Sequence, residues 1–487
     1  MKPVIAIDDG APAMSARWGL AALSLSMLLS SLGTSIANVG LPVLAQAFGA
    51  AFQDVQWIVL AYLLAITTLI VSAGKLGDIL GRRRLLLAGI ALFTLASALC
   101  GMAPALAWLI AARAVQGLGA AIMMALTLAF VAETVRRENT GRAMGLLGAS
   151  SAVGTALGPS LGGVLIAGFD WRAIFLVTVP LGLVTLYLAW RHLPADRMAT
   201  VRARGRFDLF GTLLLAVALA AYALAMTMGR GSFGPLNMAL LLTAIAAAGF
   251  FVAVERRAAS PLIRLAMFRD RTLSASLAMS MLVSTVMMAT LVVGPFYLSQ
   301  ALGLDAARVG LVLSVGPLVV ALSGVPAGRI ADRYGARRMT MAGLAAMAAG
   351  SFILALLPTA LGIPGYLAPL IVITAGYAVF QTANNTAVMS DVSADQRGVI
   401  SGLLNLSRNL GLVTGASLMG AVFALASGAR DVTTAHPLAV AAGMQVTFLV
   451  AAILIVGALA LAIACRALPE RMNTPENVIV RDPRNSI

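Results

Sequence analysis

Charged residues are scarce in this chain: they make up 11% of its 487 residues, whereas 60% are apolar. A soluble globular domain carries about 25% charged residues, so the composition excludes that class of protein. The apolar residues fill block after block of about twenty residues, the length at which a helix crosses the hydrocarbon core of a bilayer. The composition therefore predicts an all-α membrane protein, with the lipid bilayer as its surroundings.

Cysteine and histidine are scarce too. Cys100 and Cys465 fall on different predicted helices, so we interpret them as small buried apolar residues and expect no disulfide and no bound metal. His192 and His436 lie in predicted loops, and the sequence brings no nucleophile and base together. It also lacks the Gly-x-x-x-x-Gly-Lys-Ser/Thr signature of nucleotide binding. We therefore expect a protein that is not an enzyme and takes no cofactor.

The excess of basic residues reports topology. A net charge of +15 could suggest a nucleic-acid partner, but the arginines gather in short loops between apolar runs and form no basic–aromatic patch. This is the positive-inside pattern of membrane proteins. Placing both tails and the even-numbered loops inside puts most of the 34 basic residues in the cytoplasm. We therefore expect no nucleic acid as a partner, and we expect both termini to be cytoplasmic.

The apolar blocks predict fourteen membrane spans. They run near 18–42, 55–74, 84–103, 106–132, 143–167, 172–191, 208–229, 236–255, 272–299, 307–330, 339–358, 366–390, 398–427 and 441–465. An even number of spans returns the chain to the side on which it started, in agreement with the distribution of charge.

One short string is repeated in the chain. GKLGDILGRRR at 74–84 returns as GRIADRYGARR at 328–338, with glycine, cation, aspartate, glycine and two final arginines at the same offsets. We expect each copy to form a tight cytoplasmic loop, because glycine permits close helix packing and chain reversal. The residues that we expect to form a cytoplasmic gate are Gly74, Gly77, Asp78, Gly81, Arg82, Arg83, Asp332, Arg333 and Arg337. A loop repeated at this distance indicates a duplicated half-molecule, as in one class of secondary transporters.

The duplicated string resembles the signature loop of the major facilitator superfamily. Residues 32–42, 57–62 and 171–182 are similar to segments of its fourteen-helix drug:proton antiporters. The resemblance implies two pseudo-symmetric six-helix bundles that rock around a midplane site, with a two-helix insert between them. The expected parts are tails at 1–17 and 466–487, bundles at 18–191 and 272–465, and basic linkers with the inserted helices at 192–271.

The resemblance also implies a function. The family members export small amphipathic compounds, as in multidrug efflux and antibiotic resistance, by alternating access. They do so in exchange for protons, in the cell inner membrane and mostly as monomers. Two alternatives remain at this stage: a carrier or symporter for an organic anion, and a membrane sensor that does not transport.

Two arginines fall inside predicted spans. Arg113 lies about two turns into the fourth span, three residues before Gln116, and Arg408 lies about three turns into the thirteenth. Arginine is costly in lipid, so each should face protein or a water-filled cavity. The segment around Arg113 resembles the superfamily's fourth-helix motif, which is implicated in proton coupling. The alternative is a structural arginine bonded to backbone carbonyls.

The fifth predicted span carries small residues at regular spacing. They are Gly154, Gly158, Gly162 and Gly163, with Pro159 among them. A stripe at four-residue spacing lets a neighbouring helix approach closely, and proline bends a helix. In this position the pattern resembles the antiporter signature of the superfamily's exporters, which favours export over uptake.

The expected intramembrane carboxylate is missing. Family members usually carry an aspartate where this chain has Gly33, and all nineteen acidic residues fall in loops, tails or span ends. A protonatable group would then come from a span end, such as Glu133. The polar residues that could line a substrate cavity are Asn38, Gln381, Asn384, Asn385, Asn405 and Asn409. Hydrogen bonds between helices are the alternative role for these amides. We therefore expect a neutral or anionic substrate.

Overall fold

The computed structural model describes residues 12–134, 137–194, 209–227, 234–257, 265–389, 397–428 and 435–467. These residues are helical almost throughout and contain no strand. Fourteen of the described helices are long and apolar enough to cross a membrane. The prediction of an all-α membrane protein with fourteen spans is therefore confirmed.

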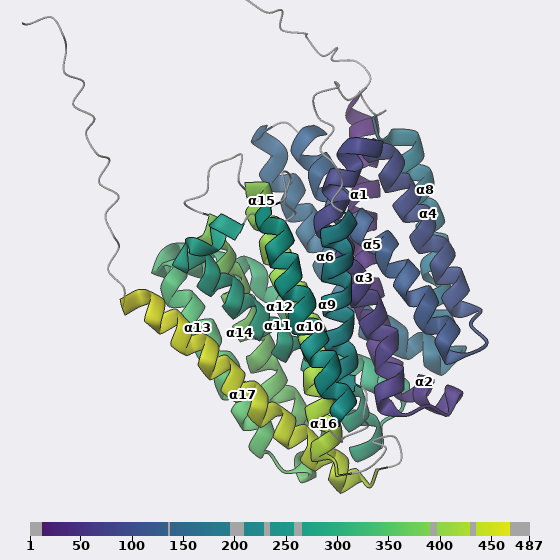
Figure 1. The fold of residues 1–487 in the computed structure, drawn as a ribbon. Helices are drawn as coiled ribbons and strands as arrows, with labels where there is room; N and C mark the ends of the chain where they lie inside the picture. The colour runs from purple at the N-terminus through teal and green to yellow at the C-terminus, as the bar shows by residue number, and fades with distance from the viewer. Residues whose placement is uncertain are drawn as a thin grey trace, which may run out of the picture.

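The spanning helices form two six-helix bundles and an inserted hairpin (Figure 1). The first bundle consists of α1 (Pro12–Val39), α3 (Phe52–Leu80), α4 (Arg82–Gly101), α5 (Leu106–Thr134), α6 (Arg137–Gly168) and α8 (Thr178–His192), with the short helices α2 (Leu41–Phe48) and α7 (Ala173–Leu176). The insert consists of α9 (Leu209–Thr227) and α10 (Pro235–Arg257). The second bundle consists of α11 (Arg271–Phe296), α12 (Ala306–Tyr334), α13 (Ala336–Leu356), α14 (Gly362–Met389), α15 (Arg397–Thr414), its continuation α16 (Gly420–Ala426) and α17 (Pro437–Ala467). A 3-10 turn, Leu265–Arg269, precedes α11.

The packing of the second bundle repeats that of the first. In the first bundle α1 packs on α6 and α8, and α5 packs on α3 and α4. In the second, α11 packs on α15 and α17, and α14 packs on α12 and α13. The two bundles meet along two related seams, one between α6 and α12 and the other between α3 and α15. This arrangement is the parallel repeat that the duplicated string predicted.

The structure corrects our expectation of a tight loop at each repeated string. Helix α3 continues to Leu80, and Gly81 alone separates it from α4, with φ at +94°. Gly335 has the same role between α12 and α13, with φ at +87°. The apolar residues before each glycine continue the helix, and only glycine adopts such a φ without strain. We call these two reversals the corners. The end of the molecule that they share is called the corner face, and the opposite end is called the far end.

Close helix packing at the first corner occurs at one of the two expected glycines. A Cβ at Gly77 would lie 2.6 Å from Leu126 Cδ2, whereas a Cβ at Gly74 would have no neighbour within 4 Å. Gly77 therefore lets α3 approach α5, and Gly74 has no such role in this conformation.

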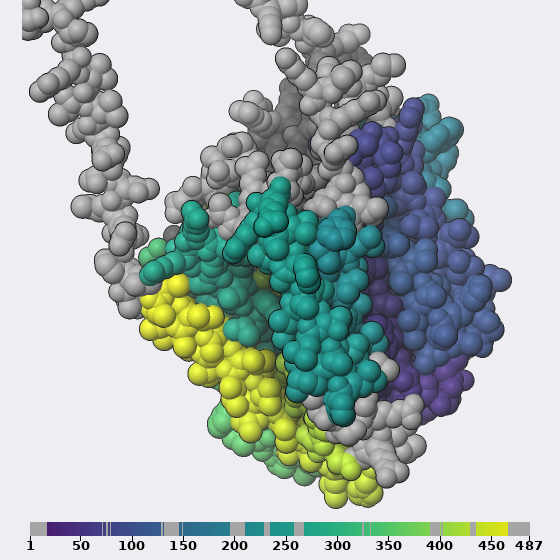
Figure 2. Space-filling view, viewed as in Figure 1, coloured from purple at the N-terminus to yellow at the C-terminus, as the bar shows by residue number. Residues whose placement is uncertain are grey.

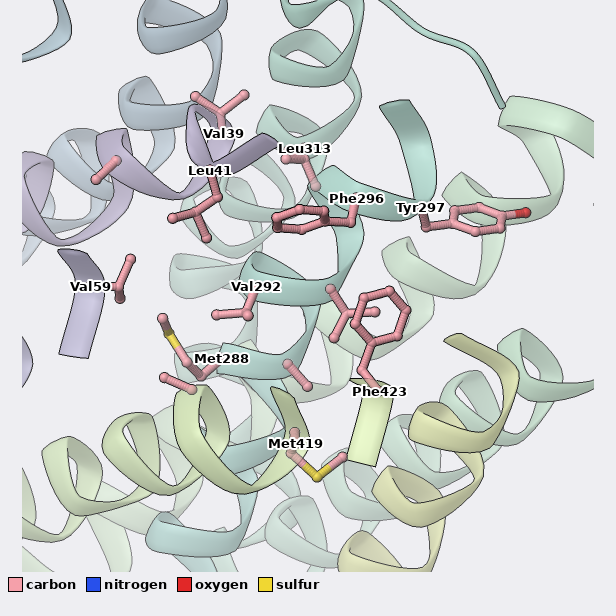
Figure 3. Packing of buried hydrophobic residues seen from close by; sticks show 14 of the residues in the cluster. Val39, Leu41, Val59, Met288, Val292, Phe296, Tyr297, Leu313, Met419 and Phe423 are labelled. Carbon is pink, nitrogen blue, oxygen red and sulfur yellow. The ribbon is translucent and has the colours of Figure 1, made fainter. Parts of the chain in front are cut away.

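Aromatic side chains from both bundles close the far end. Phe52 of α3 meets Phe296 of α11 edge to face with ring centroids 4.7 Å apart, and its ring lies 5.4 Å from that of Phe423. The Gln56 amide donates to the carbonyl of Ala416 at 3.1 Å, across the seam between α3 and α15. Figure 3 shows side chains from both bundles meeting in this cluster. The far end is thus sealed by a continuous apolar core.

The inserted hairpin covers the seam between α3 and α15. In α9, Thr212 bonds Ser72 at 2.8 Å, and Thr227 accepts from the Trp57 indole at 3.1 Å. Tyr222 of α9 lies beside Thr414 and Ser417 of the second bundle. Helix α9 therefore contacts both bundles, and Figures 1 and 2 show the hairpin, in teal, lying between them.

Candidate functional site

Arg113 is fully buried in α5 and bonded to neutral acceptors from three helices. Its Nε donates to the carbonyl of Ile58 at 2.9 Å, one terminal nitrogen donates to the carbonyl of Gly33 at 3.0 Å, and the other to Gln116 Oε1 at 2.6 Å. Gln116 in turn donates to Ser97 Oγ at 2.7 Å. The guanidinium therefore links α1, α3 and α5 and reaches α4 through Gln116.

The ring of Tyr62 covers the guanidinium of Arg113. The guanidinium carbon lies 4.1 Å from the ring centroid, within the range of cation–π attraction. The Tyr62 hydroxyl donates to the carbonyl of Ser30 in α1 at 2.8 Å. No acidic side chain is among the hydrogen-bond partners of Arg113 in the described part of the chain. This geometry is that of the structural alternative, in which the arginine binds backbone carbonyls.

Gly33, where the family resemblance leads us to expect aspartate, lies in the centre of this network. A Cβ at this position would lie 2.7 Å from Tyr62 Oη and 3.1 Å from Cζ. Both atoms belong to a rigid buried ring, so the ring would have to move. The missing carboxylate and the position of Tyr62 are therefore linked: this packing accommodates glycine and no larger residue.

The packing makes a prediction for the restored carboxylate. We expect Gly33→Asp to lower Tm through the contact with Tyr62, by an overpacking cost of about 1–3 kcal/mol. Gly33→Asp with Tyr62→Phe should recover part of the loss, because the nearest atom is removed. Thermal unfolding of the two single variants and the double variant measures the coupling. If the loss of stability in the double variant equals the sum of the losses in the two single variants, Gly33 and Tyr62 do not interact as described.

The glycine stripe of α6 faces α1. A Cβ at Gly154 would lie 2.4 Å from the carbonyl oxygen of Leu28, and a Cβ at Gly158 would lie 1.9 Å from Ser35 Oγ. Gly162 continues the same contact, with Val39 Cγ1 at 2.7 Å from its Cβ position. These three glycines set the distance between two helices of one bundle.

Pro159 and Gly163 face the other bundle instead. A Cβ at Gly163 would lie 2.5 Å from the carbonyl oxygen of Ala306 in α12. A Cβ at Gly310 would lie 2.3 Å from the carbonyl oxygen of Pro159. The backbones of α6 and α12 therefore touch where the two bundles meet, close to the far end. Gly310 was not among the residues that the sequence predicted.

The expected cavity residues do not form one group. Asn384 donates to the carbonyl of Ser276 at 3.4 Å, a bond between helices of one bundle, and Asn38 donates to Thr34 of its own helix at 2.9 Å. Gln381 donates to Asn385 Oδ1 at 3.3 Å within α14. Asn405 has a partner as well. The bond of Asn384 is that of the packing alternative, a bond between helices, whereas Asn38 bonds only its own helix.

Arg408 and Asn409 have unbonded buried donors, whereas the unbonded buried atoms of Asn38 and Gln381 are acceptors. Arg408 is half-buried, and its Nε is buried without a hydrogen-bond partner in the structure as described. Asn409 is 3% exposed, and its Nδ2 likewise has no bond. Unsatisfied donors inside a membrane protein are costly. These two neighbours on α15 can therefore accept a ligand that brings hydrogen-bond acceptors.

The gate prediction stays open. The side chains of Asp78, Asp332 and Glu133 lie outside the described residues. Among the described gate residues, Arg83 donates to the carbonyl of Trp190 in its own bundle, and the Arg333 guanidinium lies 5.5 Å from the ring centroid of Tyr334. Arg82 and Arg337 have partners too.

Several residues of this site were not among those that the sequence predicted. Tyr62 belongs to a family-like segment, but its contact with Arg113 is set by tertiary packing. Gln56 and Tyr222 are polar residues in apolar helices, and polarity inside a span is the one signal that could have identified them. The sequence placed Glu255 at the end of a span, and the structure shows in addition that its side chain is only 3% exposed there.

Two repeated bundles, two seams between them and a sealed far end define a secondary transporter of the alternating-access type. Residues 23–416 match the family model of the Major Facilitator Superfamily. The chain belongs to this superfamily.

Relatives at about one-third identity are named as drug-resistance or transport proteins. The chain is 33% identical to the multidrug resistance protein Stp of Mycobacterium tuberculosis, over 83% of this chain and 75% of that protein. It is 30% identical to the multidrug efflux pump LfrA of Mycolicibacterium smegmatis, over 83% and 80%. It is 29% identical to the riboflavin transporter RibZ of Clostridioides difficile, over 84% and 89%.

Solved structures share the fold. A bacterial homolog of the human lysosomal transporter Spinster superposes with a TM-score of 0.69 at 14% identity, over 93% of this chain and 97% of that chain. The human organic anion transporter MFSD10 has a TM-score of 0.61 at 17% identity, over 92% and 99%. At this identity the likeness concerns the fold alone. The chain is thus a multi-pass membrane transporter.

Proposed function

We propose that this transporter exports small neutral or anionic amphipathic compounds in exchange for protons. The observation that carries the proposal is the charge inside the spans: Arg113 and Arg408 are present, and glycine stands at position 33. A permanent cation would meet two positive charges and no fixed negative one. An anion or a neutral compound rich in acceptors meets no such barrier.

The two arginines have different roles in this proposal. Arg113 is sealed behind Tyr62 with all its bonds made to neutral acceptors, so it fixes the geometry of α1, α3 and α5. Arg408, half-buried and with an unbonded Nε, is the group that contacts the substrate. Asn409 supports it as a second unbonded donor. Of the two arginines that could hold a negative group, this assignment selects Arg408.

The direction of transport and its coupling to protons are supported by other observations than the substrate class. The glycine stripe of α6 resembles the antiporter signature, and Stp and LfrA are described as multidrug resistance and efflux proteins. RibZ is described as a transporter of riboflavin, which shows that relatives at this identity handle different substrates. The positive-inside distribution supports a position in the cell inner membrane with the corner face on the cytoplasmic side. The far end then faces outward and is closed in this conformation.

A second candidate is a carrier or symporter for an organic anion. The unbonded Arg408 serves an anion moving in either direction, and position 33 holds no proton-binding group. The direction of net transport separates the two candidates, because an exporter in exchange for protons accumulates substrate on the acidic side.

Efflux from cells tests the substrate class. In a host without its own pumps, we expect the unmodified chain to lower accumulation of a neutral or anionic fluorescent compound and to leave a quaternary ammonium dye unaffected. Arg408→Gln should abolish efflux of the anionic compound, and Asn384→Ser serves as a control because Asn384 makes a packing bond. Robust efflux of the quaternary ammonium dye that survives Arg408→Gln would refute the proposal.

A further inference from the structure

A cavity of about 770 Å³ lies in the second bundle beside the corner at Gly335. Its lining includes Arg337, Arg338 and Thr340 of the corner, Asn384 of α14, and Ala462 and Cys465 of α17. It is separate from Arg113, Arg408 and the two seams that serve alternating access.

The matching end of the first bundle carries aromatic side chains. Arg83, which has the offset of Arg337 in the repeated string, donates to the carbonyl of Trp190 at the end of α8. Beside it, the ring of Trp18 stacks on His192 with centroids 6.2 Å apart. The second bundle puts α17 in the place of α8, and the last turns of α17 carry small residues. Ala462 and Cys465 thus line the cavity at the end of α17, whereas Trp190 and His192 stand at the end of α8.

The walls of the cavity combine positive charge with apolar surface. Arg337 and Arg338 line one side. Among the described residues of the lining, Asp270 is the acidic one, and its carboxylate caps α11 by accepting from the backbone N–H of Thr272 at 2.8 Å and of Leu273 at 3.3 Å. Methionines 267, 279 and 341 supply flexible apolar surface on other sides. A ligand with a negative head and an apolar tail matches both parts.

We propose that this cavity binds the anionic headgroup of a phospholipid from the inner leaflet. The corner face carries the basic residues and lies at the cytoplasmic surface by the positive-inside rule, so the cavity is level with the headgroups of that leaflet. Arg337 and Arg338 bind the phosphate, since guanidinium groups match phosphate oxygens in charge and geometry. The methionine surface receives the first carbons of an acyl chain. A bound headgroup then ties the corner to α11, α14 and α17.

The test is lipid-dependent thermal stability of the full-length protein in detergent. We expect dioleoyl-phosphatidylglycerol to raise Tm at concentrations where dioleoyl-phosphatidylcholine does not. Arg338→Gln should raise the half-maximal phosphatidylglycerol concentration about fivefold, the effect of one arginine at an anionic surface. Arg84→Gln is the matched control, because Arg84 has the same offset in the first corner and is not among the residues that line the cavity.

A second variant fills the cavity and leaves its charged residues unchanged. Ala462→Trp, which places a large ring inside the cavity, should abolish the response to phosphatidylglycerol in a folded protein. Equal weakening by Arg338→Gln and Arg84→Gln would mean general surface attraction and would overturn the proposal. So would an unchanged lipid response in folded Ala462→Trp. The same rise in Tm with millimolar glycerol 3-phosphate would assign the cavity to a soluble anion and overturn the lipid as its source.

Discussion

Gly310→Leu is expected to abolish most transport while leaving both six-helix bundles folded. The Cβ alone would lie 2.3 Å from the carbonyl oxygen of Pro159 and 2.9 Å from Gly163 Cα, across the seam between α6 and α12. The side chain therefore destabilises only the state in which the far end is closed. An overpacking cost of about 1–3 kcal/mol shifts a two-state equilibrium by about 5- to 150-fold.

Accessibility of the far end reports this shift directly. In a chain whose Cys100 and Cys465 are replaced by alanine, a cysteine at the fully buried position Leu41 should react faster with an impermeant maleimide when Gly310→Leu is present. Gly457→Leu is the control, because a Cβ there would have no neighbour within 4 Å. Gly154→Leu should instead lower Tm, since its contact lies within one bundle. Unchanged labelling together with full transport would show that the Gly310 contact does not close the far end.

Arg113→Ala is expected to destabilise the first bundle and to abolish transport. The substitution removes two bonds to carbonyls of other helices and leaves a void against Tyr62. We expect a loss of about 2–4 kcal/mol in the free energy of unfolding, from the void and the lost interhelical bonds. Arg113→Lys should lose nearly as much, because an ammonium cannot reach Ile58, Gly33 and Gln116 together in the planar arrangement of a guanidinium.

The pH dependence of residual transport separates positioning from proton coupling. If Arg113 positions the helices, Arg113→Lys lowers the rate at every pH by the same factor and lowers Tm. If Arg113 takes part in proton coupling, Arg113→Lys changes the shape of the pH profile at nearly unchanged Tm. Our account predicts the first result, and the second would return Arg113 to the coupling role implied by the family resemblance.

The fold could be predicted because its signals are local. Apolar blocks of spanning length gave the fourteen helices, and the repeated string gave the duplication. Helix ends at the corners could not be predicted, because the residues before Gly81 and Gly335 suit a loop in water and a helix packed on a neighbour equally well. The glycine spacing in α6 indicated close approach, but only tertiary structure shows that Gly158 meets α1 and Gly163 meets α12.

The site was predictable in its parts and not in its connections. The sequence identified Arg113, Gln116 and the missing carboxylate at position 33, but it could not show that the Gly33 carbonyl is itself an acceptor for Arg113. The same holds for Arg408, whose depth in the span was evident while its unbonded Nε was not. The partners of a buried polar group depend on how its helix is rotated about its own axis. A helix that is apolar on all sides does not specify this rotation.

Transport into proteoliposomes under an imposed pH gradient tests the central claim most directly. The claim is that this chain couples proton movement to export of neutral or anionic compounds without a carboxylate in the first span. We predict that the gradient drives accumulation of such compounds by the unmodified chain, and that Arg408→Gln removes the transport of the anionic ones. If the gradient has no effect until Gly33→Asp with Tyr62→Phe is introduced, the unmodified chain is an uncoupled carrier and the claim is contradicted.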